Sequence, residues 1–330
     1  MELVTDISGP EWRDFLERTP GSSIFQSPAM ARVFRHTKGY RPRVVAAHRG
    51  SAMRALMAST TVSYGKGRLS PLSSRSIVVG GPIGDINAFS ELLTAHDAIS
   101  AKSVLLTQIR NLDAPLDLRP FDSVAYRWED HLNYVIDLRA GERAVLDGMS
   151  KARRKSITKA EESGLEIEQV QPNRLDLAYV LVNETYSRAR VPLADVSLFR
   201  SAIEFLRPGG NLWTFAAKYE GSACAVRFVL LWGTTIYDWY AGSSEAGRAL
   251  HADEWLVWQI LRKGMQRGYG TFDFHGAGRP GKEYGPGEFK RRFGGRQTNP
   301  GRFEKVYRPL TLKLVKATYN VGRKLRWAPG

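Results

Sequence analysis

The sequence of 330 residues has few of the residues that form disulfides and metal sites: it contains one cysteine and six histidines. Cys224 lies in the apolar run SACAVRFVLLW, and because it has no second cysteine to pair with, an internal disulfide is excluded and a reducing compartment is expected. Apolar surroundings also raise the pKa of a thiol, so we interpret Cys224 as a core residue rather than a nucleophile. The histidines are scattered without ligand spacing, and no metal site is predicted.

Long apolar runs are also missing. No stretch approaches the roughly 20 consecutive apolar residues that a membrane-spanning helix needs. The opening MELVTDISGPEW has neither the basic nor the apolar region of a signal peptide. We therefore expect a cytoplasmic protein.

Acidic residues are scarce relative to basic ones. The chain holds 48 Lys and Arg against 33 Asp and Glu, a net charge of +15, and most of the excess lies in residues 151–330, with 30 against 17. This asymmetry indicates a polyanionic partner, such as tRNA, a diphosphate-bearing precursor or the inner face of an anionic membrane. Solubility, or a generally basic proteome, is the alternative explanation.

The length exceeds that of one ordinary domain, and 43% hydrophobic residues suffice for two cores. Mixed strands and helices predict α/β or α+β architecture, and the second half shows a helix pair, an antiparallel meander, a helix and a strand. The predicted helices include 9–18, 28–38 (capped by Ser27), 87–100, 142–163, 172–190, 196–207 and 251–267. The clearest predicted strands are 165–170, 212–219, 223–232 and 235–240.

The stretch 269–295, YGTFDFHGAGRPGKEYGPGEFKRRFGG, combines a strand, a glycine loop and a basic helix. Its period-2 pattern places Asp273 and His275 where the strand becomes the loop. The segment EFKRRFGG then predicts a short helix with Phe289 and Phe293 on one face and two glycines at its end. A loop and a helix of this kind could cradle an anion.

Three segments together resemble one family. The succession FDFHGA, EYG and FKRRFGG, followed by GRFEKVYRPL and a basic helix, is similar to the C-terminal end of the Fem-type peptidyltransferases. The segment KARRKSITKAEESGLEIE resembles a basic helix of that family that ends in Lys-Ala-Glu-x-Ser-Gly before a strand, and GSSIFQSPAM resembles a segment near its start. The chain is thus similar over most of its length to the Fem-type (FemABX) proteins of the GNAT acyltransferase superfamily.

This resemblance implies two tandem GNAT-like domains, each a mixed, largely antiparallel sheet flanked by helices, at 1–140 and 141–308, and a basic C-terminal helix at 309–330. It implies an aminoacyltransferase that moves an aminoacyl group from aminoacyl-tRNA to an amine of a diphosphate-bearing or lipid-linked cell-wall peptide precursor, without cofactor or covalent intermediate. A monomer is expected. The C-terminal helix is expected to dock on its own domain or to contact an anionic membrane.

The resemblance assigns Lys290 to the transfer step, because it matches the Lys of the family's Phe-Lys-x-x-Phe-Gly motif; a solvated lysine on a docked helix is the alternative. Aminoacyl transfer to an amine needs an unprotonated nucleophile, orientation and stabilisation of an oxyanion. Asp273 is the candidate acceptor for the amine's proton, with His275 or Glu283 behind it, and a role as loop cap is the alternative.

The helix 149–163 is predicted to present basic residues along one side, which the resemblance places beside the acceptor; an exposed charged helix is the alternative. Aromatic residues of the strand 235–240 line a cleft or, alternatively, belong to the core. The predicted substrate-binding residues are Lys151, Arg154, Lys155, Tyr237, Trp239, Glu283, Tyr284, Arg291 and Arg292.

An acetyltransferase of the GNAT superfamily holds the pyrophosphate of coenzyme A on backbone amides of a Gln/Arg-x-x-Gly-x-Gly/Ala loop at a helix N-terminus. The corresponding segment here, SEAGRA at 244–249, has serine where Gln or Arg belongs. This departure favours the tRNA donor. An N-acyltransferase that uses acyl-CoA remains the second interpretation, and a non-catalytic binder of RNA or anionic membrane is the third.

Overall fold

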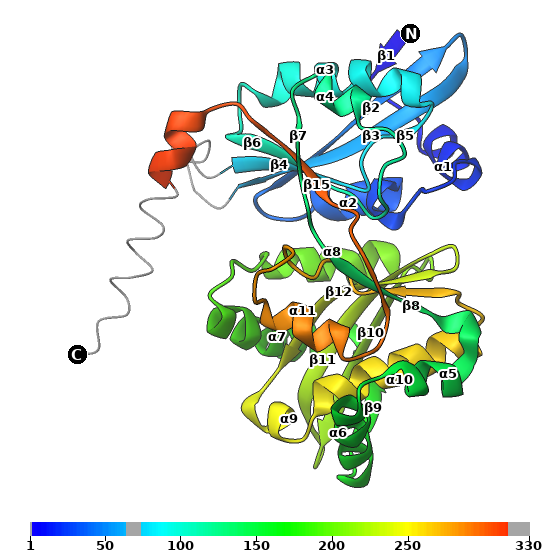
Figure 1. Cartoon of the computed structure of the whole chain (residues 1–330), viewed down its shortest axis with the longest axis vertical. Helices are drawn as coiled ribbons and strands as arrows, with labels where there is room; N and C mark the ends of the chain where they lie inside the picture. The colour runs from blue at the N-terminus through cyan, green and yellow to red at the C-terminus, as the bar shows by residue number, and fades with distance from the viewer. Residues whose placement is uncertain (1, 64–73, 316–330) are drawn as a thin grey trace. The chain divides into compact units, whose positions relative to one another are not determined.

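The computed structural model describes residues 2–63 and 74–315 (Figure 1). The chain divides into two compact units: residues 1–129 with 300–330 form unit 1, and residues 130–299 form unit 2. Each unit contains a mixed sheet flanked by helices, which confirms the predicted fold class.

The second helix of unit 1 begins at the residue that the sequence predicts, Pro28. The strands are β1 (Glu2–Val4), β2 (Tyr40–Arg49), β3 (Ala52–Ser63), β4 (Ser74–Val79), β5 (Ile83–Gly84), β6 (Leu106–Arg110), β7 (Arg127–Glu129) and β15 (Arg302–Val306). The helices are α1 (Gly9–Arg18), α2 (Pro28–Arg35), α3 (Phe89–Ser100) and α4 (Arg119–Asp122). Helix α2 starts at Pro28 because Ser27 Oγ accepts a hydrogen bond from the Met30 amide, 3.0 Å away.

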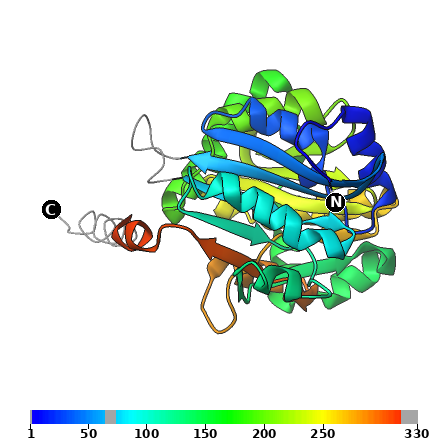
Figure 2. The same cartoon turned by 90° about the horizontal axis from the view of Figure 1, so that it is seen from above.

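The sheet of unit 1 has the order β1-β2-β3-β4-β6-β15-β7, with β5 on β3. Strands β4 and β6 are parallel, and the other described pairs are antiparallel. Figure 2 shows α3 lying against one face of this sheet, where Leu92 and Leu93 are fully buried with Val45 and Ile109. The unit thus has a core of its own.

Unit 2 contains the candidate site. Its strands are β8 (Asn133–Asp137), β9 (Glu166–Gln169), β10 (Leu212–Tyr219), β11 (Ser222–Trp232), β12 (Thr235–Ser243), β13 (Thr271–Asp273) and β14 (Arg296–Thr298). Its helices are α5 (Gly141–Gly148), α6 (Lys151–Glu162), α7 (Leu175–Ala189), α8 (Val196–Leu206), α9 (Glu245–Ala249), α10 (Ala252–Gln266) and α11 (Gly285–Arg291). The strand order is β14-β8-β13-β12-β11-β10-β9, and only the pair β12–β13 is parallel among the described pairs of this sheet.

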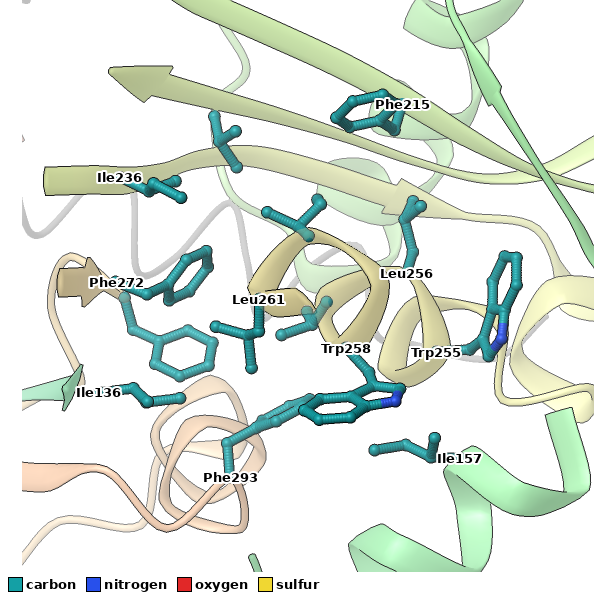
Figure 3. Packing of buried hydrophobic residues seen from close by; sticks show 14 of the residues in the cluster. Ile136, Ile157, Phe215, Ile236, Trp255, Leu256, Trp258, Leu261, Phe272 and Phe293 are labelled. Atoms are coloured by element: carbon teal, nitrogen blue, oxygen red, sulfur yellow. The ribbon is translucent and has the colours of Figure 1, made fainter. Parts of the chain in front are cut away.

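Helix α10 is the centre of the core of unit 2. It is hydrophobic on most sides, and Figure 3 shows it between Phe215 and Ile236 of the sheet on one side and Ile157 and Phe293 on the other. The opposite face of the sheet packs on α7 and α8, where the ring of Phe228 meets Phe199 at 5.0 Å. Unit 2 therefore has the sheet as its middle layer.

The predicted helix 142–163 is two helices. The chain is extended at Met149, and Ser150 then caps α6 by accepting from the Arg153 amide at 3.2 Å. A serine with this geometry begins a new helix because it satisfies an amide that lacks a helical partner.

The unit boundaries differ from the expected domains 1–140 and 141–308. The segment Asn133–Asp137 pairs with β13 and β14 and so belongs to unit 2. The segment Arg302–Val306 lies between β6 and β7 in unit 1, because its Phe303 is fully buried and stacks on Phe121 at 4.0 Å. The chain thus returns to unit 1 after unit 2 is complete.

The predicted C-terminal helix lies mostly outside the described residues. Residues 309–315 are helical, with Leu310 and Leu314 exposed. In the described part of the chain, no helix combines the length and the hydropathy of a membrane span.

Candidate functional site

The site forms where the two parallel strands of unit 2 separate. Residues 235–237 of β12 pair with 271–273 of β13, but β12 continues to Ser243 while β13 ends at Asp273. At this point β12 contains a β-bulge: Asp238 and Tyr240 oppose consecutive residues of β11, which leaves Trp239 as the extra residue. Bulges of this kind redirect a strand and are frequent beside active sites.

Asp273 and Asn133 fix the loop that follows β13. Asp273 is buried, and its Oδ1 accepts from the His275 amide at 2.6 Å and from Asn133 Nδ2 at 2.7 Å. Asn133 Oδ1 in turn accepts from the amides of Tyr134 and Gly276, at 2.8 and 3.0 Å. Asp273 is thus a loop cap, the alternative role that the sequence left open.

This network holds His275 in a left-handed backbone conformation, with φ of +60°. This backbone conformation costs free energy in a residue other than glycine, and it persists where the surrounding structure holds it in place. The ring of His275 meets that of buried Tyr237 edge to face at 6.2 Å. The structure therefore brings together three predicted residues: Asp273, His275 and Tyr237.

Lys290 reaches back from α11 to the same loop. Its Nζ donates to the carbonyl oxygens of Phe274 at 2.6 Å and Gly276 at 2.5 Å and lies 3.4 Å from that of His275. An ammonium group has three N–H donors. In this conformation Lys290 organises the carbonyls of the loop and brings a positive charge to it.

The other predicted residues of the glycine loop lie farther out. Glu283 is exposed, and Tyr284 is about half exposed, with its ring over Gly278. Gly278 has φ of +89°, and a Cβ there would lie 2.9 Å from the Tyr284 ring, so both the conformation and the close approach require glycine. Trp239 packs on Phe199 and Tyr240, whereas Tyr237 meets the ring of His275.

Arg153 connects α6, α10 and α11, a role that the sequence did not indicate. Its buried guanidinium lies 4.5 Å from the ring centre of Phe289 and 4.3 Å from that of Phe293. It also donates to the Phe289 carbonyl at 3.0 Å and pairs with Glu254 at 2.9 Å. Burial, only partly offset by nearby acids, lowers the pKa of Arg153 to about 10, so the group stays charged at neutral pH.

Arg227 is a second buried arginine that the sequence analysis missed. It pairs with Asp238 at 2.6 Å and with Asp253 at 2.5 Å. Burial lowers its pKa, but the two carboxylates outweigh that effect and raise it. A signal was present, because one arginine inside the apolar strand SACAVRFVLLW requires a buried acidic partner.

The predicted basic face of α6 is narrower than expected. Lys151 and Lys155 are exposed, but Arg154 turns inward and donates to the carbonyls of residues 146, 147 and 149, which end α5. Arg154 therefore caps a helix. The amide of Ser150 donates to the Arg292 carbonyl at 3.0 Å, so the start of α6 adjoins the end of α11.

Arg291 and Arg292 extend the basic face onto α11. Both are about half exposed or more, and both pair with Glu288, at 2.7 and 2.9 Å. These hydrogen bonds lower the pKa of Glu288 to about 2, so this carboxylate is ionised at neutral pH. Two arginines against one glutamate leave the exposed side of α11 positive.

The segment 244–249 does not form an open cradle for a pyrophosphate. It is the helix α9, in which Ser244 accepts from the Gly247 amide, and Gly247 packs directly on the Cys224 carbonyl. The first turn of α10 then carries Asp253 and Glu254, whose carboxylates pair with the buried Arg227 and Arg153. The residues present do not fit coenzyme A in this place.

Among the described residues, no group of His, Cys, Asp and Glu side chains could hold a metal ion. Cys224 is buried, and burial raises its thiol pKa. It lies in the core, as the sequence indicated.

Part of unit 2 is similar in sequence to a known family. Residues 149–291 match the family described as "Acetyltransferase (GNAT) domain". The matched residues make up most of unit 2. The prediction of an acyltransferase in the GNAT superfamily is thereby confirmed, and no curated protein matches the chain in sequence.

Solved structures extend the similarity of fold to the whole chain. FemX has a TM-score of 0.72 at 15% identity, covering 95% of this chain and 99% of its own. The C-terminal domain of a putative lysylphosphatidylglycerol synthetase from Agrobacterium fabrum has a TM-score of 0.58 at 16% identity, covering 94% and 95%. A tandem GNAT protein from the clavulanic acid biosynthesis pathway has 0.60 at 10% identity, covering 93% and 98%. The fold is Fem-like and of the tandem GNAT kind.

Proposed function

We propose that this protein transfers an aminoacyl group from aminoacyl-tRNA to an amine of a cell-wall peptide precursor that carries a diphosphate or a lipid. One observation carries the proposal most directly. An exposed basic face on α6 and α11 adjoins the loop that Lys290 organises, where β12 and β13 separate. A polyanionic donor can therefore bind beside a loop that is already fixed in place.

The reaction needs no covalent intermediate with the protein. The acceptor amine attacks the carbonyl carbon of the aminoacyl ester, a C–N bond forms, and the bond to the ribose oxygen of the tRNA breaks. The proton lost from the amine ends on that ribose oxygen, so the products are an amide and uncharged tRNA. The barrier falls when the reactants are oriented and the negative charge on the carbonyl oxygen is stabilised.

Lys290 provides positive charge next to the loop and keeps its carbonyls in one arrangement. Asp273 acts through the backbone, because its hydrogen bond to the His275 amide sets the conformation of the loop. The exposed Lys151 and Lys155, with Arg291 and Arg292, bind phosphates of the donor or the acceptor. These four residues supply binding, and Lys290 supports the transfer step.

A second function is an N-acyltransferase that takes its acyl group from acyl-CoA. The match to an acetyltransferase domain favours it. The closed helix α9, whose Gly247 packs against the Cys224 carbonyl, argues against the usual pyrophosphate position. An acyl-CoA donor would have to bind elsewhere.

The experiment that tests the proposal compares donors. The purified protein is incubated with either labelled aminoacyl-tRNA or labelled acetyl-CoA and a panel of amine acceptors, including cell-wall peptide precursors. We expect amide formation from aminoacyl-tRNA, and donor binding whose logarithmic salt dependence becomes shallower in Lys151→Gln/Lys155→Gln. Transfer from acetyl-CoA alone would establish the second function. Binding of tRNA without transfer to any acceptor would favour a non-catalytic binder.

A further inference from the structure

One edge of unit 1 carries a short helix whose leucines are exposed. Residues 309–315 are helical and follow β15, and both views show this helix beside the sheet of unit 1 (Figures 1 and 2). Leu310 is 76% exposed and Leu314 is 68% exposed. Because they are four residues apart, the two side chains lie on the same side of the helix. They form an apolar stripe that faces water.

The start of this helix is fixed to unit 1. The amides of Tyr307 and Arg308 donate to the carbonyl of Leu105, at 2.9 and 3.3 Å. The guanidinium of Arg308 also donates to the carbonyl of Lys102, which directly follows the end of α3, at 2.9 Å. The segment is therefore docked on its own unit through the residues that precede the helix, while Leu310 and Leu314 remain in water.

The charge around the two leucines is positive. Lys313 lies between them in sequence and is exposed, and the exposed Lys102 lies at the Arg308 contact. The sequence continues this character, because residues 305–330 contain seven Lys and Arg and no Asp or Glu. Cations that flank exposed leucines are typical of a surface that binds anionic lipid.

The acidic residues of the neighbouring elements do not offset this charge. Strands β4 and β6 contain none. On α3, Asp97 is buried and pairs with Lys305 at 2.6 Å, and Glu91 lies in the first turn, at the other end of the helix from Lys102. On β15, Glu304 lies opposite Arg127 of β7. Lys102, Arg308 and Lys313 therefore leave this edge with a net positive charge.

We propose that this edge of unit 1 binds the surface of an anionic lipid membrane. Leu310 and Leu314 enter the boundary of the acyl chains, and Lys102, Arg308 and Lys313 contact the lipid phosphates. A membrane suits this edge better than a nucleic acid does, because leucines gain free energy when they pass from water into hydrocarbon, whereas a phosphate backbone gives them no apolar contact. The proposal does not depend on aminoacyl transfer.

The test uses the full-length protein and no donor or acceptor. Sedimentation measures binding to vesicles of phosphatidylcholine that contain phosphatidylglycerol and to vesicles of phosphatidylcholine alone, each at several salt concentrations. We expect saturable binding to the anionic vesicles and weaker binding to phosphatidylcholine. Added salt should weaken the binding to anionic vesicles, because it screens the attraction between the cations and the phosphates.

A pair of leucine substitutions tests the apolar part of the contact. Leu310→Asn/Leu314→Asn should weaken binding to the anionic vesicles by about tenfold or more, because it removes the side chains that enter the lipid. Leu177→Asn/Val180→Asn is the matched control. Leu177 and Val180 are 55% and 51% exposed on α7 of unit 2, so the control removes two similar side chains elsewhere, and binding should not change.

A lysine substitution tests the charge. Lys313→Gln should weaken binding to the anionic vesicles roughly fivefold and leave binding to phosphatidylcholine unchanged. Lys282→Gln is the control, because Lys282 is an exposed lysine of unit 2 and its replacement removes the same charge from a different surface.

The proposal is overturned if the Leu310→Asn/Leu314→Asn variant, folded by circular dichroism, binds anionic vesicles as well as the native protein does. Equal weakening by Leu177→Asn/Val180→Asn would also overturn it. Binding of tRNA is measured in parallel. Loss of tRNA binding in Lys313→Gln, with unchanged vesicle binding in the leucine variant, would assign this edge to RNA and would contradict the proposal.

Discussion

Asp273 could accept a proton from the substrate amine or hold the backbone of the loop, and its hydrogen bonds favour the second role. One oxygen accepts from both the His275 amide and the Asn133 side chain. An asparagine in its place keeps an oxygen for the amide. We therefore predict that Asp273→Asn retains most of the turnover, whereas Asp273→Ala, which has no acceptor, loses it.

Initial-rate measurements on the two Asp273 variants distinguish the roles. If Asp273 were a general base, its replacement by asparagine would lower turnover roughly 100-fold or more. A large loss in Asp273→Asn, with native circular dichroism, would therefore assign proton transfer to Asp273.

Lys290 is the residue whose loss should affect the reaction most. In Lys290→Met the loop carbonyls lose their ammonium donor and the site loses a positive charge, so we predict a decrease in turnover of roughly 100-fold with little change in donor binding. Lys282→Met is the control, because Lys282 is an exposed lysine of the same segment. Equal turnover in Lys290→Met and Lys282→Met would show that Lys290 does not support the transfer step.

At the scale of elements, the position of α11 depends on a side chain of another helix. Arg153 of α6 stacks on two phenylalanines of the α11 segment, donates to the Phe289 carbonyl and pairs with Glu254 of α10. Lys290 directly follows Phe289. A disturbance at Arg153 should therefore reach the loop through α11.

We predict that Arg153→Met lowers the free energy of unfolding by about 3 kcal/mol, because it leaves Glu254 without its buried partner. Denaturant unfolding measures this. Arg143→Met is the control: its side chain is 96% exposed and its ion pair is long, at 3.8 Å, so a change below about 0.5 kcal/mol is expected. Equal effects of the two variants would show that the packing of Arg153 contributes nothing.

Local patterns in the sequence predicted most elements of unit 2, because caps, turns and periodicity act over a few residues. The helix start at Pro28 and the meander 212–240 appear where predicted. The break at Met149 was missed, because a serine inside a basic helical run looks the same whether or not it caps a new helix. Lys290, Asp273 and His275 lie within one predicted strand-loop-helix stretch, and the structure brings Tyr237 of β12 beside them.

Contacts between distant segments could not be predicted in this way. Arg227, Asp238 and Asp253 meet only after β11, β12 and α10 have folded together. The inward turn of Arg154 likewise depends on where α5 ends. Helical spacing alone placed Arg154 on an exposed basic face, because it cannot tell which side of the helix will be covered.

At the scale of the whole molecule, unit 1 is completed by β15, whose neighbours β6 and β7 lie far earlier in the sequence. Lys305 of β15 pairs with Asp97 of α3 at 2.6 Å, and Tyr307 donates to the same carboxylate at 2.5 Å. The hydroxyl of Thr107 links Tyr307 to the Nε2 of His96, at 2.8 and 3.1 Å. A buried polar network therefore joins α3, β6 and the returning strand.

From this network we predict that acid lowers the stability of unit 1. Burial, partly offset by Asp97, lowers the pKa of His96 from 6.5 to about 4. Between these values the unfolded chain holds a proton on His96 that the folded chain does not, so the free energy of unfolding should fall as the pH decreases through this window, by up to about 3 kcal/mol. Unfolding measured from pH 7 to pH 4 should show a shallower decline in His96→Gln, whereas His36→Gln, which alters an exposed histidine, should keep the native slope. Parallel slopes in His96→Gln and the native protein would place the acid sensitivity at groups other than His96.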